Sequence, residues 1–465
     1  MTPRALALAG LATLALVGVA LAGDTTGSKG VGDDFFPRAG NGGYDVDHYK
    51  LGLRYNPNRG RLRATAEIRA TVDQPAGLSR FDLDFRGPRI TVLKVNGEPA
   101  DFRRKGQELI VTPAELLPHG SEFEVRVRYV GRPQEITDPD GSIEGWVRTG
   151  DGAFVVGEPQ GSPTWFPCSD HPTDKATYRF RVNVPRGIKA IANGTLEDRI
   201  RRHGRRIFVW RQSEPMATYL ATVTSGRFRL TRSDVELNAG TIPSWVAIDP
   251  RESEGALDEL PEILALFEES FGDYPFSSTG GVVDRAPRVG YALETQTRAL
   301  YPGTPGSALV AHELAHEWFG NSVTLARWPE IWLNEGFATW AEWYWLENDG
   351  GKAVADRVDD LYDSHGPGDA QFWNPPPADV PGPGKMFDNT VYVRGGMALE
   401  ALRREVGDPD FFDILQAWAA TNPHDPATTD EFITVAKAEA NEPDAQLDAL
   451  FQDWLYQSGK PGPLP

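Results

Sequence analysis

The spacing of apolar residues changes near residue 240, and this change constrains the fold more than any other feature of the sequence. Over residues 44–237, apolar and polar residues alternate, as in FEVRVRYV (123–130) and YRFRVNVP (178–185). A period of two is typical of strands with one buried face, and such strands commonly form antiparallel sheets. The pattern therefore predicts an N-terminal domain of antiparallel strands, shaped as a sandwich or a saddle.

After residue 240 the apolar residues follow a helical period instead. The first such stripe consists of Leu257, Leu260, Leu264, Phe267 and Phe271, and Gly272 is expected to end that helix. Helical spacing then continues, apart from a Pro- and Gly-rich loop over residues 364–385, which is predicted to be either a cleft rim or a solvated surface loop. The sequence thus predicts an α+β multidomain fold whose second domain, residues 238–465, is mainly helical.

The N-terminal residues predict export. Residues 1–22 contain one basic residue, Arg4, and then an uncharged Ala-, Leu- and Val-rich stretch that ends in Ala-Leu-Ala. This is typical of a secretory signal peptide cleaved after Ala22, and the alternative is an uncleaved membrane anchor. We expect a secreted or periplasmic protein with no membrane span after cleavage, because no other segment is apolar enough. Residues 23–43 are polar and rich in Gly, which predicts a flexible leader.

Composition excludes some classes of partner. The chain has 465 residues, 40% of them hydrophobic, which is enough for two or three domains with large cores. Its net charge of −19 disfavours nucleic acid as a partner. The single cysteine, Cys168, cannot form an intrachain disulfide. We expect it to be a buried small residue, with a reactive thiol as the alternative. Nothing in the sequence indicates an oligomeric state.

The run HELAHEWFG predicts a metal site. His312 and His316 are four residues apart, so on a helix they share one face, roughly 5–6 Å from each other. Glu313 stands between them and can reach a water molecule on the metal, which is the general-base position of an H-E-x-x-H motif. Glu335, in WLNEGFATW, follows His316 by nineteen residues. Two His and one Glu leave a fourth position open, which is the catalytic zinc arrangement, and one Zn²⁺ per chain is expected.

The sequence around these residues supports the prediction. Leu309, Val310 and Leu314 give the first motif a helical apolar face, and the segment after Pro329 has the pattern of a second helix. In that second helix, an Asn-Glu pair lies among Trp and Leu residues, where burial is costly without a partner. A metal ion supplies such a partner.

Three motifs together resemble the aminopeptidase N family of gluzincin zinc peptidases: HELAHEWFGN, the spacing from it to WLNEGFATW, and the later YVRGG. The resemblance covers roughly residues 44–459. It implies a β-saddle domain followed by a thermolysin-like catalytic domain. It also implies that His312, His316 and Glu335 are the zinc ligands and that Glu313 is the general base.

The resemblance assigns three further residues. Tyr392, in Tyr-Val-Arg-Gly, matches the tyrosine that donates a hydrogen bond to the oxyanion, although a core tyrosine at a helix start is the alternative. Glu158, counted back from FPCSDHP, matches a residue that recognises the free amine of the substrate. Glu294 matches the Glu of the family's Gly-x-Met-Glu-Asn signature. Without the family context, Glu158 and Glu294 would be interpreted as exposed carboxylates among 66 acidic residues.

The sequence departs from the family in two places. The Gly-x-Met-Glu-Asn signature appears over residues 290–295 as GYALET, so the preference for a substrate side chain cannot be transferred. The sequence also ends soon after the catalytic domain, without the large C-terminal helical domain common in the family, and we therefore expect a more open cleft.

We predict a secreted zinc aminopeptidase that acts on peptides with a free N-terminus. The alternative among enzymes is a zinc endopeptidase or another zinc hydrolase on the same scaffold, and N-acetylation of the substrate distinguishes the two. A catalytically silent peptide-binding protein is the alternative from another class. That alternative is disfavoured because the three ligands and the base are all present.

Overall fold

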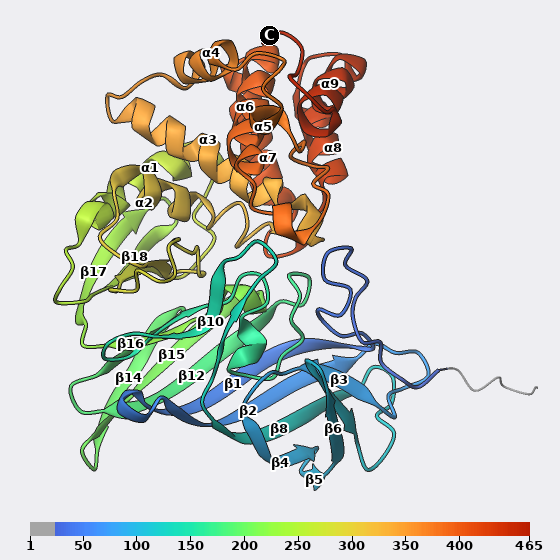
Figure 1. Cartoon of the computed structure of the whole chain (residues 1–465), viewed down its shortest axis with the longest axis vertical. Helices are drawn as coiled ribbons and strands as arrows, with labels where there is room; N and C mark the ends of the chain where they lie inside the picture. Colours follow the sequence, from blue (N-terminus) through green and yellow to red (C-terminus); the bar gives the residue numbers. More distant parts are fainter. Residues whose placement is uncertain (1–23) are drawn as a thin grey trace, which may run out of the picture.

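A computed structural model describes residues 24–465 and shows a sheet-rich half below a helical half (Figure 1). The predicted order of strands and then helices is confirmed. Cys168 is fully buried, as expected for a small core residue. Among the helices of this part of the chain, none has the length and apolar character needed to cross a membrane. The predicted signal peptide lies outside the described residues.

The N-terminal half is built on an eight-stranded sheet with the order β14-β15-β12-β1-β2-β8-β4-β5. All neighbours are antiparallel except β1 and β12, which run parallel. The alternation in the sequence gives the sheet one apolar and one polar face, because Leu51 and Leu53 on β1 are buried while Lys50 and Arg54 are exposed. The strands are β1 (Tyr44–Asn56), β2 (Arg61–Val72), β4 (Arg89–Val95), β5 (Glu98–Pro99), β8 (Glu122–Gly131), β12 (Ala176–Pro185), β14 (Thr195–Arg202) and β15 (Arg205–Met216).

Two smaller sheets complete this half. Aromatic side chains join the layers: the ring of Trp146 on β10 packs edge-on against Tyr55 on β1, 4.9 Å away between centroids. The five-stranded sheet has the order β13-β16-β11-β10-β9 and consists of β9 (Glu135–Thr137), β10 (Ile143–Arg148), β11 (Ala153–Val156), β13 (Lys189–Ala192) and β16 (Val223–Gly226). The three-stranded sheet consists of β3 (Phe81–Asp84), β7 (Glu108–Thr112) and β6 (Asp101–Lys105).

A four-stranded sheet opens the second half. β17 (Arg229–Leu237) pairs antiparallel with β18 (Gly240–Ile248), and β19 (Thr279–Val283) and β20 (Ala299–Tyr301) follow in parallel. The sequence pattern assigned residues up to 237 to the first domain. Hydrogen bonding instead puts β17 with the second half, because its partner is the next strand in the chain and not a strand of the large sheet.

Helices make up most of the second half. The stripe predicted between Leu257 and Phe271 is buried, and the helix ends at Gly272, whose φ is 92°. The loop over 364–385 contains a short helix, α5, so it is not wholly irregular. The helices are α1 (Leu260–Phe271), α2 (Ser307–Ala315), α3 (Trp332–Asn348), α4 (Val354–Ser364), α5 (Ala370–Trp373), α6 (Asn389–Val406), α7 (Asp408–Thr421), α8 (Thr429–Glu439) and α9 (Asp444–Phe451). Two short strands, β21 (Thr324–Leu325) and β22 (Pro426–Ala427), pair beside them.

The segment predicted to be a flexible leader is packed against both halves. The Asp33 carboxylate accepts hydrogen bonds from the backbone N–H groups of Phe36 and Trp328, each at 2.8 Å. The Phe36 ring lies edge-on to Trp328, with 6.1 Å between centroids. Asp33 and Phe36 are only 2% and 7% exposed, so the prediction of flexibility does not hold for this part of the leader.

Candidate metal centre and cleft

The two histidines of the HELAH run converge on one glutamate. His312 lies on α2 and His316 directly follows it, while Glu335 lies in the first turn of α3. Nε2 of His312 lies 3.2 Å from Oε2 of Glu335, and Nε2 of His316 lies 3.5 Å from the same oxygen. Tetrahedral zinc with bonds near 2.0–2.1 Å places its ligand atoms about 3.4 Å apart. The spacing of the three side chains therefore fits one zinc ion, and they form a possible metal-binding group as predicted.

The other nitrogen of each imidazole has its own partner. Nδ1 of His316 lies 3.1 Å from the carbonyl oxygen of Phe319, and Nδ1 of His312 lies 3.5 Å from the Glu342 carboxylate. Such contacts orient the rings, so that Nε2 of each faces the centre of the site. Glu342 lies seven residues after Glu335 on α3, which is two helical turns and hence the same face.

Charge at the centre is arranged to attract a cation. Burial alone would raise the pKa of the Glu335 carboxyl, but the imidazoles of His316 and His312 lower it to about 2. Burial likewise opposes a charge on His316, yet the carboxylates of Glu294 and Glu335 raise its pKa to about 9. Both shifts have the same origin, because the buried carboxylates require positive charge between them. A divalent cation at this point meets that requirement.

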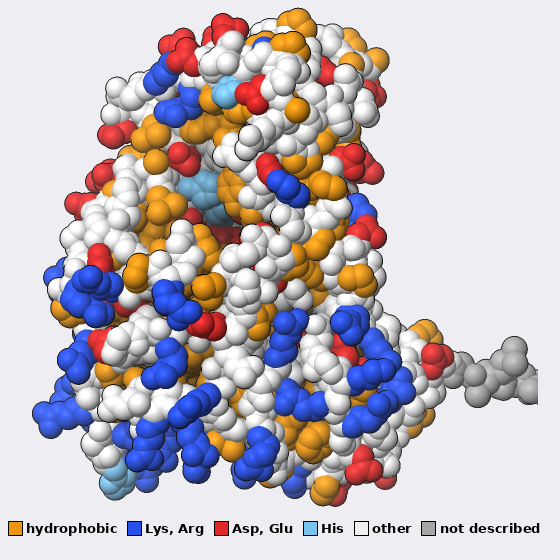
Figure 2. All heavy atoms as spheres, viewed as in Figure 1, with side chains coloured by type: hydrophobic (Ala, Val, Ile, Leu, Met, Phe, Trp, Pro, Cys, Tyr) orange, Lys and Arg blue, Asp and Glu red, His pale blue; other side chains and the backbone are white. Residues whose placement is uncertain are grey.

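All seven residues predicted from the sequence line one pocket of about 450 Å³. The metal-binding group and Glu313 form one part of its wall, Tyr392 comes from α6, and Glu294 comes from the loop before β20. Glu158 is the one member of the seven that the N-terminal half contributes, just after β11. Figure 2 shows a hollow above the middle of the molecule, at the level of α1 and α2 in Figure 1, with histidine side chains visible in it.

Glu158 and Glu294 are buried, at 6% and 3% exposure, so the alternative of exposed carboxylates is excluded. One oxygen of each, Oε1, has no hydrogen-bond partner in the described part of the chain. Burial, followed by repulsion from Glu294, holds the pKa of Glu158 well above its ordinary value, and burial raises the pKa of Glu294. Two buried acids with free acceptor atoms are suited to binding a cationic group.

Glu313 and Tyr392 face the same space. Oε2 of Glu313 is buried without a hydrogen-bond partner, and burial raises the pKa of this carboxyl to about 8. The Tyr392 ring stacks near His312, with 6.2 Å between the ring centroids. Tyr392 lines the pocket and is partly exposed, which favours a position in the cleft over the alternative of a core tyrosine.

A buried amide that the sequence analysis did not single out supports the loop of Glu294. The side-chain N–H of Asn321 donates to the carbonyl oxygen of Glu294 at 2.8 Å and to the Glu317 carboxylate at 3.1 Å. Glu317 in turn accepts from the backbone N–H of Thr297 at 2.8 Å. The end of the HELAHEWFGN run thus fixes residues 294–297. Asn321 is the last residue of the HELAHEWFGN motif, and this was the only indication in the sequence that it could matter. The contact itself could not be predicted, because Asn321 and Glu294 are 27 residues apart in the sequence.

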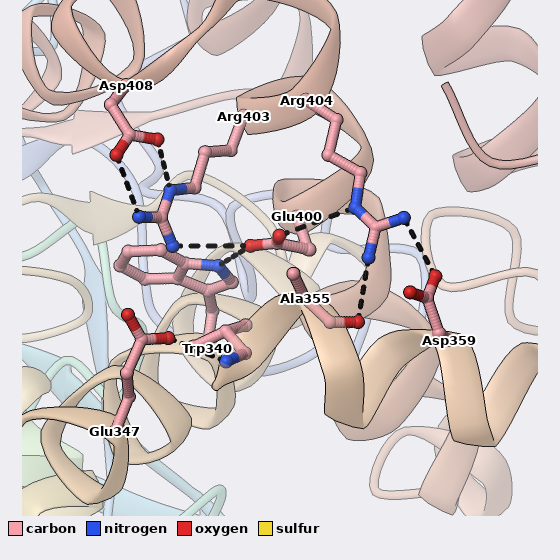
Figure 3. A network of polar contacts seen from close by, with 9 residues as sticks. Trp340, Glu347, Ala355, Asp359, Glu400, Arg403, Arg404 and Asp408 are labelled. Carbon is pink, nitrogen blue, oxygen red and sulfur yellow. Dashed lines mark hydrogen bonds and ion pairs between the residues drawn. The ribbon is translucent and has the colours of Figure 1, made fainter. Parts of the chain in front are cut away.

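The helices that carry Glu335 and Tyr392 are held together in two ways. At their crossing, α3 and α6 place Gly336 against Gly395 so closely that a Cβ on Gly395 would lie 2.9 Å from Cα of Gly336. Further along, the indole N–H of Trp340 on α3 donates to Glu400 on α6 at 3.1 Å (Figure 3). The positions of the two site residues are therefore determined by backbone contact as well as by polar contacts.

A charged network extends this support to the neighbouring helices (Figure 3). Glu400 is 2% exposed and is paired with both Arg403 and Arg404. Arg403 donates to Asp408 on α7, and Arg404 donates to Asp359 on α4. The buried Glu400 carboxylate is thereby compensated, and α6 is tied to three other helices.

Two segments of the chain match one family of peptidases. Residues 45–220 match the Peptidase M1 N-terminal domain, and residues 296–454 match the Peptidase family M1 domain. A two-domain M1 zinc metallopeptidase with bound L-arginine superposes with a TM-score of 0.85 at 30% sequence identity, over 94% of this chain and 99% of that chain. The chain belongs to the M1 peptidase family. The predicted family resemblance and the α+β fold class are confirmed for this M1 peptidase, as is its class as a zinc metallopeptidase.

Other relatives of this M1 peptidase differ in length. The M1 zinc metallopeptidase of Deinococcus radiodurans has a TM-score of 0.84 at 30% identity and covers 94% of this chain and 98% of its own. A variant of that enzyme has been solved with the substrate Tyr-Ser-Ala. Aminopeptidase M1 of Arabidopsis thaliana is 27% identical over 86% of this chain, and probable aminopeptidase 2 of Sulfurisphaera tokodaii is 23% identical over 90%. The chain spans 48% and 54% of these two curated relatives, about half their length.

Proposed function

We propose that this M1 peptidase is a secreted zinc aminopeptidase that removes the N-terminal residue of peptides. One observation carries the proposal: two buried carboxylates with unpartnered oxygens, Glu158 and Glu294, share a pocket with the His312, His316 and Glu335 group. A peptide ammonium bound between two such carboxylates has its first peptide bond close to the metal-binding group. An endopeptidase needs no such pair, because an internal peptide bond has no ammonium beside it.

The metal-binding group would hold the zinc cofactor. When bound there, zinc polarises the scissile carbonyl and lowers the pKa of a water molecule among its ligands. His312, His316 and Glu335 would hold the ion, and the contacts to Phe319 and Glu342 keep the two imidazoles turned toward the centre of the site. The relatives with substrate or amino acid bound are M1 zinc metallopeptidases, which supports the same chemistry in this chain.

Glu313 is assigned the proton transfers. It follows His312 on the same helix, and its buried Oε2 has no other hydrogen-bond partner. Its carboxylate accepts a proton from the attacking water and delivers it to the nitrogen of the departing peptide. This assignment uses a group that is already desolvated and faces the pocket, so no side chain has to move into place.

Tyr392 and the two recognition carboxylates complete the assignment. The hydroxyl of Tyr392 donates a hydrogen bond to the oxyanion that forms on the scissile carbonyl. Glu158 and Glu294 accept charge-assisted hydrogen bonds from the substrate ammonium and so fix which peptide bond is presented. Asn321 holds the backbone at Glu294 and therefore acts as a positioning residue for this recognition.

A panel of reporter substrates tests the function. The purified chain is assayed with aminoacyl reporters that have a free amine, with the same reporters after N-acetylation, and with each set after a zinc chelator. We expect hydrolysis of the free-amine reporters only, loss on chelation and recovery when zinc is added back. Efficient cleavage of N-acetylated substrates, or of internal peptide bonds, would indicate an endopeptidase. Retention of all activity without zinc would reject the proposed chemistry.

Export is proposed from the sequence of residues 1–22. The test is to express the full sequence, separate the medium or periplasm from membranes, and determine the first residue of the recovered protein. A protein in the soluble exported fraction that begins at Gly23 is expected. Recovery in the membrane fraction with Met1 retained would instead support the uncleaved anchor.

A further inference from the structure

The two halves of the molecule carry very different charge. Residues 24–228 contain 31 Lys and Arg against 26 Asp and Glu, whereas residues 229–465 contain 15 against 40. Figure 2 shows Lys and Arg side chains gathered over the lower, sheet-rich half. A protein of net charge −19 does not need a basic surface to stay soluble. The basic surface therefore requires another explanation.

The strongest concentration lies at two hairpin tips, which we call the arginine tips. One tip joins β1 to β2 over residues 54–63 (RYNPNRGRLR), and the other joins β14 to β15 over residues 201–206 (RRHGRR). Neither run contains an acidic residue, and together they hold eight arginines. Arg205 links the tips, because its guanidinium donates to the carbonyl oxygen of Tyr55 at 2.8 Å.

Like charges face each other across the strands of both tips. Arg54 is the cross-strand partner of Arg63, Arg201 of Arg206, and Arg202 of Arg205. Directly opposed like charges destabilise a strand pair. None of the eight arginines takes part in an ion pair with another described residue. The repulsion is thus left uncompensated within the described chain, which is the arrangement expected where an anion binds.

The tips also form a concave site. A hollow of about 340 Å³ lies between them and is lined by Arg54, Asn56, Arg59, Arg61, Arg63 and Arg205, with no carboxylate in its wall. Arg205 is fixed by its bonds to the backbone of Tyr55 and Asn183. Burial, followed by the charge of Arg54, lowers the pKa of Arg205.

The chemistry of the side chains narrows the class of anion. Guanidinium groups bind phosphate oxygens in pairs of parallel hydrogen bonds. No aromatic side chain is exposed in either run, since Tyr55 is buried, and so there is no aromatic platform for stacking bases. None of the exposed large hydrophobic residues of the described chain lies in the tips, so nothing there inserts into a bilayer. Eight arginines on two adjoining tips exceed what one small phosphate can contact.

We propose that the arginine tips bind a linear phosphate polymer that has no bases, and that the M1 peptidase is thereby tethered by its sheet-rich half. This inference is independent of the proposed aminopeptidase activity. The sheet-rich half contributes Asp140, Ser142 and Glu158 to the pocket, and none of the residues of the arginine tips lines that pocket. A tethered molecule therefore keeps its cleft available to peptides.

Binding of inorganic polyphosphate to the full chain tests the proposal. We expect binding that weakens as salt rises, and a loss of about tenfold in affinity for the double variant Arg54→Gln/Arg63→Gln. Arg103→Gln/Lys105→Gln is the matched control, because both residues are exposed on β6 and the change in net charge is the same. The control is expected to bind like the parent. All three proteins should share one rate on a free-amine reporter, and the tip variant should melt no earlier than the parent, because its substitutions remove opposed like charges.

Several outcomes would overturn the proposal. One is that the parent does not bind polyphosphate, and another is that the tip variant and its control lose the same affinity for it. A third is that orthophosphate saturates the site with the same affinity, which would indicate a small-anion site. Equally tight binding of a single-stranded oligonucleotide would indicate a nucleic-acid partner, and equally tight binding of anionic vesicles a membrane. Loss of peptidase activity alone, with polyphosphate binding intact, would count against the proposed function and not against the tips.

Discussion

The two halves of this M1 peptidase use charged residues in opposite ways. The sheet-rich half buries carboxylates such as Asp84 and Asp174 in its interior and exposes arginines at its hairpin tips. The helical half exposes an excess of acidic residues and buries those that surround the metal-binding group. It supplies six of the seven predicted site residues, and the sheet-rich half supplies only Glu158. In the proposed function, the helical half therefore holds the reacting groups, while the sheet-rich half contributes to recognition through Glu158.

Substituting the general base tests the assignment of chemistry to the helical half. Glu313→Gln preserves the size of the side chain but cannot accept a proton, so turnover should fall by about 10²–10⁴-fold while zinc remains bound. Turnover on a free-amine reporter and zinc content measured on the same sample check this. Near-normal turnover with full zinc content would assign the proton transfers to another residue.

The hydroxyl of Tyr392 should matter almost as much. Tyr392→Phe removes one oxygen, and because an oxyanion donor acts mainly in the transition state, kcat should fall by about 10²–10³-fold with little change in KM. The control measurement is the melting temperature, which should not change. A variant that melts earlier yet keeps its turnover would show that Tyr392 supports packing instead.

Glu158 tests whether the sheet-rich half contributes recognition. Glu158→Gln should weaken binding of free-amine peptides by roughly 1.5–3 kcal/mol, the range for a hydrogen bond to a charged group. The variant for comparison is Glu294→Gln, which removes the carboxylate that the helical half contributes. We expect both to act mainly on free-amine substrates. If Glu158→Gln changes nothing while Glu294→Gln does, recognition belongs to the helical half alone.

A further expected effect concerns stability and pH in the sheet-rich half. Burial raises the pKa of Asp170 to about 7 and that of Asp174 to about 8, above the ordinary value of 3.8. Since the folded state holds these protons more tightly than the unfolded state, the stability they contribute is complete below about pH 4 and is lost as the pH rises toward 8. Each group contributes a slope of at most about 1.4 kcal/mol per pH unit.

Denaturant unfolding between pH 5 and pH 8, with zinc present, measures this dependence. Asp174→Asn resembles the protonated carboxyl and should flatten the dependence while raising stability at the alkaline end. An exposed carboxylate of the same half, Asp101, is the control site for the same substitution. A stability that rises with pH in the parent would show that these carboxyls are ionised in the folded chain.

The elements were predictable where the information is local. The alternation over β1 and the stripe of α1 are periodic patterns that depend on near neighbours, and the spacing of His312, His316 and Glu335 follows helical geometry. Partner choice was not predictable in this way. β17 follows the strands of the large sheet in the sequence, yet it pairs with β18. The Asp33 carboxylate accepts a hydrogen bond from a backbone N–H 295 residues away. The orphaned oxygens of Glu158 and Glu294 likewise depend on burial by both halves.

The contact between Gly336 and Gly395 has a consequence for how the site could be altered. Glu335 adjoins Gly336, and Tyr392 lies three residues before Gly395. The distance between Glu335 and Tyr392 is therefore determined by the backbone contact between the two glycines. The substitution Gly395→Ala adds one methyl group at this contact. It would separate α3 from α6 without changing the chemistry of any group that faces the substrate. Most substitutions in a site change both the distance between two groups and their reactivity. At Gly395, the distance between Glu335 and Tyr392 could be changed while the reactivity of both side chains is kept.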